Sequence, residues 1–85
     1  MARLEGKVAL ITGGTSGIGA DTARLFSQEG AKVIIVGRSE EKGNSLANDL
    51  GKDVVYKKAD ITKEKDISGS VDFALEKFSK LDILF

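Results

Sequence analysis

Four glycines stand within seven residues near the start of the chain, directly after a short apolar run. The run is Val-Ala-Leu-Ile at residues 8–11, and Thr-Gly-Gly-Thr-Ser-Gly-Ile-Gly follows it at 12–19. Glycine lets the backbone turn sharply and approach a ligand, because it has no Cβ. A helix that begins here aims its free N–H groups and the positive end of its dipole at the same place. A strand, a glycine turn and a helix N-terminus together predict a pyrophosphate-binding site.

A second candidate binding residue follows the next apolar run, where Gly37-Arg38-Ser39 comes after Val36. In dinucleotide-binding folds an acidic residue at this place binds the ribose 2′-hydroxyl and selects NAD, whereas a nearby arginine favours NADP. Here the acid is missing, and Arg38 can hold a 2′-phosphate as a charge-assisted fork. Ser39 can donate a hydrogen bond beside it. The sequence therefore favours NADP, with NAD as the alternative cofactor and a solvated loop arginine as the non-functional interpretation.

The glycine spacing from Gly13 is Gly-x-x-x-Gly-x-Gly, and it resembles the cofactor turn of the short-chain dehydrogenase/reductase family. Residues 3–7, Arg-Leu-Glu-Gly-Lys, also resemble the usual opening of that family. The commoner fingerprint, Gly-x-Gly-x-x-Gly, does not fit, since Thr22 replaces its last glycine. The resemblance implies that Thr12 is a structural residue that helps to hold the turn in shape. It implies cofactor contacts from the turn and the start of the helix: Gly13, Thr15, Ser16, Gly17, Ile18 and Gly19.

The resemblance also gives a role to Asp60 and Ile61, which follow the third predicted strand. It implies that Asp60 accepts a hydrogen bond from the adenine amino group while Ile61 packs near the ring. The alternative is that Asp60 is an ordinary acid at a strand end, helping to cap the next helix. Without the resemblance the two interpretations are about equally good.

Strands and helices alternate along the chain, which positions these residues. The predicted order is strand 8–11, helix 18–29, strand 32–36, helix 40–50, a strand beginning at Val54, a helix capped by Thr62, and strand 81–85. Such alternation predicts an α/β fold with a parallel sheet and right-handed crossovers. A Rossmann-type doubly wound sheet then has the strand order 3-2-1-4, and residues 1–85 form the N-terminal part of a dinucleotide-binding domain. The glycine turn lies at the carboxyl edge of its central strand.

Each predicted helix has an apolar face and an end signal. Gly30 and Gly51 supply stops for the first two helices, and Ser39 caps the second, with acidic residues in its first turn. The residues expected to face the sheet are Ile18, Thr22, Ala23 and Phe26 in the first helix, Leu46, Ala47 and Leu50 in the second, and Ile67, Val71, Leu75 and Phe78 in the third.

The resemblance implies hydride transfer between a nicotinamide and an alcohol or carbonyl. It places an Asn-Asn-Ala-Gly stretch after the fourth strand, and then a catalytic serine and a Tyr-x-x-x-Lys pair. Within these 85 residues the only tyrosine, Tyr56, is followed four positions later by Asp60. Because Tyr56 lies in a predicted edge strand, we interpret it as a packing residue. No catalytic residue is therefore assigned here, and the absence of histidine and cysteine leaves no triad, thiol nucleophile or structural metal site.

Two interpretations remain open. The chain is either the cofactor-binding part of an NADP(H)-dependent short-chain oxidoreductase, inactive alone, or a non-catalytic nucleotide-binding or interaction module. Thirteen basic and 13 acidic residues balance, which argues against a nucleic-acid partner. The aliphatic runs are too short to cross a membrane, so we expect a cytoplasmic protein. The fourth strand is expected to leave an apolar edge through which chains can self-associate.

Overall fold

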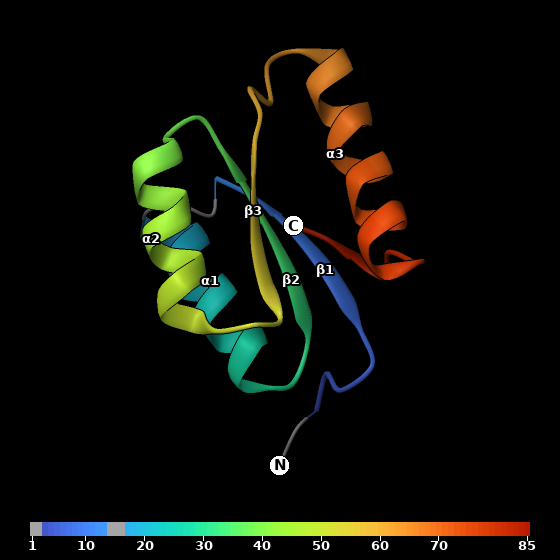
Figure 1. Cartoon of the computed structure of the whole chain (residues 1–85). Coiled ribbons are helices and arrows are strands. Elements are labelled where there is room, and N and C mark those ends of the chain that lie inside the picture. The colour runs from blue at the N-terminus through green and yellow to red at the C-terminus, as the bar shows by residue number, and fades with distance from the viewer. Residues whose placement is uncertain (1–2, 14–16) are drawn as a thin grey trace.

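The computed structural model describes residues 3–13 and 17–85, in which a four-stranded parallel sheet has helices on both faces (Figure 1). The strand order β3-β2-β1-β4 confirms the predicted Rossmann-type topology. The elements are β1 (Val8–Thr12), α1 (Gly17–Gln28), β2 (Lys32–Gly37), α2 (Glu40–Leu50), β3 (Val54–Lys58), α3 (Glu64–Phe78) and β4 (Ile83–Leu84). Helices α1 and α2 lie on one side of the sheet and α3 lies on the other.

The two central strands are buried on both faces, as their unbroken apolar sequences predict. Successive side chains point to opposite faces of a strand, so β1 and β2 contribute to two separate clusters. Ile11, Val33 and Ile35 pack with the α1 and α2 side. Leu10 and Ile34 pack on the α3 side. This double burial makes β1 a rigid support for the glycine turn that follows it.

Helix α2 begins and ends as predicted. The Ser39 hydroxyl oxygen accepts a hydrogen bond from the Lys42 backbone N–H at 3.3 Å, and Gly51 ends the helix at a φ of 110°. The expected cap of α3 is wrong, because Lys63 occupies the N-cap position. Thr62 instead donates its backbone N–H and its hydroxyl to the Asp60 carboxylate. An aspartate readily bonds the backbone two residues on, and this turn delays the helix by one residue.

The first turn of α1 does not face the sheet, contrary to prediction: Ile18 is 78 % exposed. Ala23 is the fully buried residue of this helix, and Ile18 precedes it by five positions. Five residues turn an α-helix by roughly 140° beyond a full circle, which carries Ile18 to the far side. Thr22 is only partly buried and donates its hydroxyl to the Ile18 carbonyl. Phe26 packs against the core as expected.

Helix α3 is rotated by about one residue from the predicted orientation. Its buried positions are Ser70 and Ala74, whereas Ile67 and Leu75 remain 42 % and 46 % exposed. Small side chains let the helix approach the sheet closely, and the Ser70 hydroxyl is satisfied by the Asp66 carbonyl. Of the predicted stripe, Phe78 does pack beside the core cluster.

Strand β4 is shorter than the predicted 81–85, although flanking backbone bonds extend its pairing with β1. It lies at one edge of the sheet, as expected, and Leu84 and Phe85 stay 63 % and 52 % exposed. Association of chains through this edge remains a prediction, which sedimentation at rising concentration tests.

A carboxylate fastens the start of β4 to β1. The Val8 N–H donates to Asp82 at 2.9 Å, and Lys80 pairs with the same oxygen at 3.2 Å. The hydrogen bond from Val8, assisted by Lys80 and Lys7, lowers the pKa of Asp82 below its ordinary value of 3.8. A carboxyl group whose pKa is lower in the folded chain than in the unfolded chain stabilises the fold at pH values above the unfolded-state pKa. That stabilisation is lost as the pH falls through the folded-state pKa.

We therefore expect Asp82→Asn to lower the unfolding midpoint at neutral pH, and we expect this effect to shrink as the pH falls through the lowered pKa of Asp82 and the carboxylate is protonated. Urea denaturation across a pH series measures this. Asp72→Asn, an exposed change on α3 with the same loss of charge, serves as the control. A difference between Asp82→Asn and the unchanged chain that persists undiminished in acid would contradict the assignment.

Candidate functional site

The ends of three strands meet at one edge of the sheet. The register pairs Thr12 of β1 with Val36 of β2, and Gly37 with Lys58 of β3. The residues that follow these strands therefore lie side by side, at the carboxyl edge where open α/β sheets bind ligands. The sequence had assigned Gly13, Arg38 and Asp60 to these three strand ends, and the topology brings them to the same edge.

The glycine turn has the backbone that its glycines predict. Gly13 and Gly17 adopt φ values of 65° and 59°, a left-handed conformation that side chains disfavour. A Cβ at either position would meet no described atom within 4 Å, so it is the backbone conformation that demands glycine there. Thr15 and Ser16, also assigned to the cofactor, lie outside the described residues.

The N-terminus of α1 presents its N–H groups at this turn. Helix α1 begins at Gly17, has no acidic residue in its first turn, and leaves Ile18 exposed while Gly19 is partly buried. Acidic residues at this end would compete with a bound anion for the positive end of the dipole. The arrangement suits a pyrophosphate.

Arg38 and Asp60 share one pocket. It has a volume of about 400 Å³ and is lined by Arg38, Lys58, Ala59, Asp60, Lys63 and Asp66. Hydrogen bonds from the Thr62 hydroxyl and N–H lower the pKa of Asp60, and the charges of Arg38 and Lys63 lower it further. Asp60 is therefore an anionic acceptor at neutral pH. Its neighbour Ile61 is 48 % exposed, which leaves an apolar surface beside the pocket.

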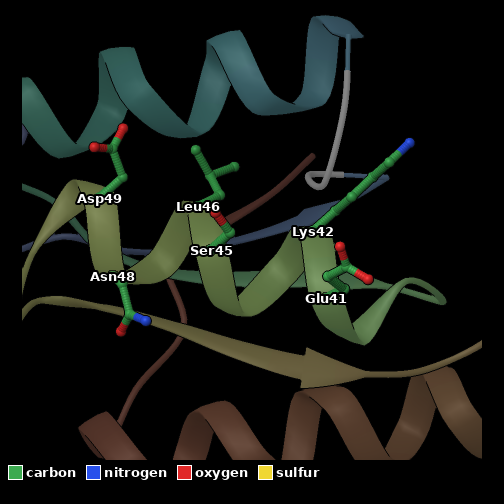
Figure 2. Close-up of a pocket in the computed structure, with 6 residues that line it drawn as sticks. All are labelled: Glu41, Lys42, Ser45, Leu46, Asn48 and Asp49. Carbon is green, nitrogen blue, oxygen red and sulfur yellow. The ribbon is translucent and has the colours of Figure 1, made fainter.

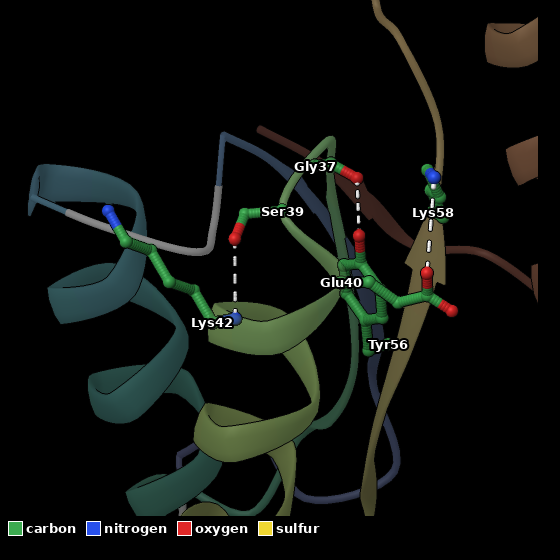
Figure 3. A network of polar contacts seen from close by, with 6 residues as sticks. All are labelled: Gly37, Ser39, Glu40, Lys42, Tyr56 and Lys58. Carbon is green, nitrogen blue, oxygen red and sulfur yellow. Dashed lines mark hydrogen bonds and ion pairs between the residues drawn. The ribbon is translucent and has the colours of Figure 1, made fainter.

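The 37–40 segment, which carries Arg38, is held by several contacts (Figure 3). The Gly37 carbonyl accepts a hydrogen bond from the Tyr56 hydroxyl at 2.7 Å and another from the Ala59 N–H at 3.1 Å. Ser39 uses its oxygen as the cap of α2, which leaves its hydroxyl proton available to a ligand. Burial, and next the charge of Glu40, raise the pKa of Tyr56, so the phenol stays protonated and donates.

Three charged residues of the pocket were missed by sequence reasoning: Lys58, Lys63 and Asp66. Asp66 accepts a hydrogen bond from the Asp60 N–H at 2.7 Å and so orients the assigned adenine contact. Asp66 stands three residues after the N-cap Lys63, but it bonds the N–H of Asp60 and not the N–H of the N-cap residue, so the capping-box pattern does not predict this contact. The position of Lys58 could have identified it, because it is the last residue of β3 and ligands bind at the carboxyl ends of such strands.

Thr12 was predicted to help hold the glycine turn in shape, and its contacts in the described residues are instead to Phe85, the residue after β4. Its hydroxyl and its N–H both donate to the Phe85 carbonyl at 2.9 Å. Thr12 thus fastens the carboxyl ends of β1 and β4 together, beside the glycine turn.

A larger hollow, of about 650 Å³, runs along α2 and faces α1 (Figure 2). Its lining is Glu41, Lys42, Ser45, Leu46, Asn48 and Asp49. These are mostly solvated side chains of one helix, so volume alone does not make this the site. Across residues 3–13 and 17–85, no cluster of metal-ligating side chains occurs and no helix is long and apolar enough to cross a membrane.

The family model for short chain dehydrogenases matches residues 7–85, which is nearly the whole chain. The chain belongs to the short-chain dehydrogenase family. Short-chain dehydrogenase reductase 3a of Arabidopsis thaliana is 51 % identical over 84 residues, covering 98 % of this chain and 33 % of the relative. Tropinone reductase-like 1 of Erythroxylum coca is 51 % identical over 83 residues, covering 98 % of this chain and 30 % of the relative.

Among solved structures of short-chain dehydrogenases, the 3-ketoacyl-(acyl-carrier-protein) reductase of Brucella melitensis, complexed with NADH, is 48 % identical. It superposes with a TM-score of 0.92 over 95 % of this chain and 33 % of its own. The chain therefore spans about a third of the length of the short-chain dehydrogenases it matches. Both the predicted family and the predicted fold are confirmed.

Proposed function

We propose that residues 1–85 form the cofactor-binding N-terminal part of an NADP(H)-dependent oxidoreductase that acts on an alcohol or carbonyl. The observation that supports this most is the meeting of Gly13, Gly17, Arg38 and Asp60 at the carboxyl edge of one parallel sheet. The solved relative that carries NADH shows that a nicotinamide dinucleotide is bound within this family.

In this proposal the residues divide the cofactor between them. The turn at Gly13, Thr15, Ser16 and Gly17 and the N-terminus of α1 hold the pyrophosphate, with Ile18 and Gly19 beside it. Asp60 accepts from the adenine amino group, and Ile61 covers the ring. Arg38 and Ser39 hold a 2′-phosphate. The nicotinamide, when bound, supplies or accepts the hydride.

NADP is proposed over NAD because of charge at the end of β2. Gly37 ends the strand, and neither of the next two residues, Arg38 and Ser39, has a carboxylate that could accept from a ribose 2′-hydroxyl. The first acid after them, Glu40, pairs with Lys58 at 3.9 Å. The guanidinium of Arg38 is exposed and stands next to the N-terminus of α2, which also favours an anion. The NADH in the relative concerns that protein, and NAD stays the alternative cofactor for this chain.

Titration calorimetry of the 85-residue chain with NADP⁺ and with NAD⁺ tests the proposal. We expect both to bind, with NADP⁺ the tighter ligand. Gly17→Val should lower the affinity for both dinucleotides, because a valine rarely adopts the left-handed backbone found there and its side chain would occupy the place proposed for the phosphate. Gly69→Val, at a position without positive φ and with open space around it, is the matched control. Equal affinity for NADP⁺ and NAD⁺ would defeat the NADP assignment, and no binding would defeat the site.

The same material tests an expectation that both interpretations of the chain share. Neither the Tyr-x-x-x-Lys pair nor any other proton-transfer constellation occurs in these 85 residues. We therefore propose that they bind cofactor without oxidising an alcohol or reducing a carbonyl, as the binding-module alternative also requires. Oxidation of NADPH by the pure chain with a carbonyl substrate, above the Gly17→Val background, would contradict this.

A further inference from the structure

Two residues of the edge strand contact the segment that carries Arg38. Tyr56 and Lys58 are two positions apart in β3, so their side chains lie on the same face of the sheet. That face is the one covered by α2, since Tyr56 packs with the cluster that contains Ala47. Lys57, between them, points to the opposite face and lies over the Phe73 ring of α3 at 5.8 Å.

Tyr56 fixes the peptide that precedes Arg38. Its hydroxyl donates to the Gly37 carbonyl at 2.7 Å, and the bond is partly buried. Its ring lies flat against α2 at Gly43, where any Cβ would collide with the ring carbons. A ring held between strand and helix has little freedom, so the hydroxyl acts as a fixed donor. The peptide between Gly37 and Arg38 is held in one orientation.

Lys58 acts on the same segment through charge. Its ammonium lies 3.9 Å from the Glu40 carboxylate, with both side chains about two-thirds exposed (Figure 3). Glu40 is two residues after Arg38 and next to Ser39, so its charge would oppose a 2′-phosphate bound there. Lys58 also lines the pocket that Arg38 and Asp60 share. One cation therefore offsets Glu40 and faces the place proposed for the phosphate.

From these contacts we propose that Tyr56 and Lys58 are positioning residues that set the preference of this chain for a 2′-phosphorylated dinucleotide. Tyr56 orients the backbone from which Arg38 extends, and Lys58 neutralises Glu40 beside it. The inference rests on the proposed function, because it concerns the same dinucleotide site. It adds that the edge strand β3, rather than the end of β2 alone, determines which cofactor is selected.

The test is the ratio of dissociation constants for NAD⁺ and NADP⁺, measured by calorimetry at one fixed salt concentration. Tyr56→Phe keeps the ring on Gly43 and removes only the hydroxyl. We expect it to lower the ratio roughly 2- to 10-fold, the value of one net hydrogen bond. The affinity for NADP⁺ should fall while the affinity for NAD⁺ stays nearly unchanged. A general loosening of the fold would instead lower both affinities alike.

Lys58→Met should lower the ratio about 2- to 5-fold, as expected for an exposed, salt-screened charge. Lys57→Met is the matched control, because it removes the same charge from the same strand on the other face. It should leave the ratio unchanged. Lys58→Arg, which restores the cation, should recover most of the preference.

The outcomes distinguish this inference from the function on which it rests. A chain that binds NADP⁺ more tightly than NAD⁺, with the ratio unchanged in Tyr56→Phe or in Lys58→Met, overturns the inference and leaves the proposed function standing. An equal fall of the ratio in Lys57→Met and Lys58→Met also overturns it. A chain that binds neither dinucleotide, or both equally, overturns the two together.

Discussion

Replacing Arg38 with alanine is expected to weaken the binding of NADP⁺ roughly 10- to 100-fold, because a charge-assisted hydrogen bond contributes about 1.5–3 kcal/mol. The same substitution should change the affinity for NAD⁺ little, since NAD⁺ carries no 2′-phosphate. Arg38 follows β2 directly and lines the pocket with Asp60, while its side chain remains exposed and free to turn toward a ligand. Calorimetry with the two dinucleotides measures both affinities.

The matched control for Arg38→Ala is Arg24→Ala. Arg24 is an exposed arginine of α1 that pairs with Asp49 of α2 at 3.5 Å, away from the strand ends. Its removal changes the net charge equally, so any general electrostatic attraction falls by the same amount in both variants. Equal losses of NADP⁺ affinity in the two variants, or equal losses of NADP⁺ and NAD⁺ in Arg38→Ala, would show that Arg38 does not hold the phosphate.

Gly43→Ala is expected to destabilise the fold by about 1–3 kcal/mol, although alanine is the better helix former. Helix propensity alone would favour alanine by about 1 kcal/mol. The new methyl group, however, meets the ring carbons of Tyr56, which is held by its bond to Gly37. Overpacking typically costs 1–3 kcal/mol, and displacing the ring also breaks that hydrogen bond, worth about 0.5–1.5 kcal/mol. The unfavourable terms exceed the favourable one.

Gly69→Ala provides the matched comparison, since Gly69 also lies in a helix interior but has open space around its Cβ position. It should stabilise the chain by up to about 1 kcal/mol. Thermal unfolding measures both, and a domain of this size changes its melting temperature by roughly 4–8 °C per kcal/mol. Opposite signs are expected: a fall of several degrees for Gly43→Ala and a rise of a few for Gly69→Ala. Two rises would show that the Tyr56 ring yields to the methyl group.

Much of the fold was predictable because its signals are local. Unbroken apolar, β-branched runs predicted β1 and β2, and glycines with positive φ ended α1 and α2 where expected. Ser39 capped α2 as its residue type predicts. Alternating strands and helices predicted a parallel sheet, and interpreting it as a Rossmann-type doubly wound sheet gave the order 3-2-1-4, which the sheet has.

The helix faces were less predictable, because packing and not residue size alone decides them. The large apolar residues Ile67 and Leu75 marked one stripe of α3, but the helix packs through Ser70 and Ala74. Close approach to a flat sheet favours small residues at the centre of the contact and leaves larger ones at its margins. The start of α3 also differs from the prediction, because Thr62 donates its N–H and its hydroxyl to Asp60. A helical pattern of apolar residues does not reveal this pairing of two polar side chains.

The sequence by itself determined the family, the topology and the assignment of Gly13, Gly17, Arg38 and Asp60 to strand ends. These depend on residue type and spacing within short stretches of chain. Only the tertiary structure decided which side chains surround them. Tyr56 reaches Gly37 across 19 positions, Lys58 reaches Glu40, and Asp66 turns back to Asp60. Such contacts depend on strand register and on how closely a helix packs, and both are set by the summed packing of the whole sheet rather than by any local segment.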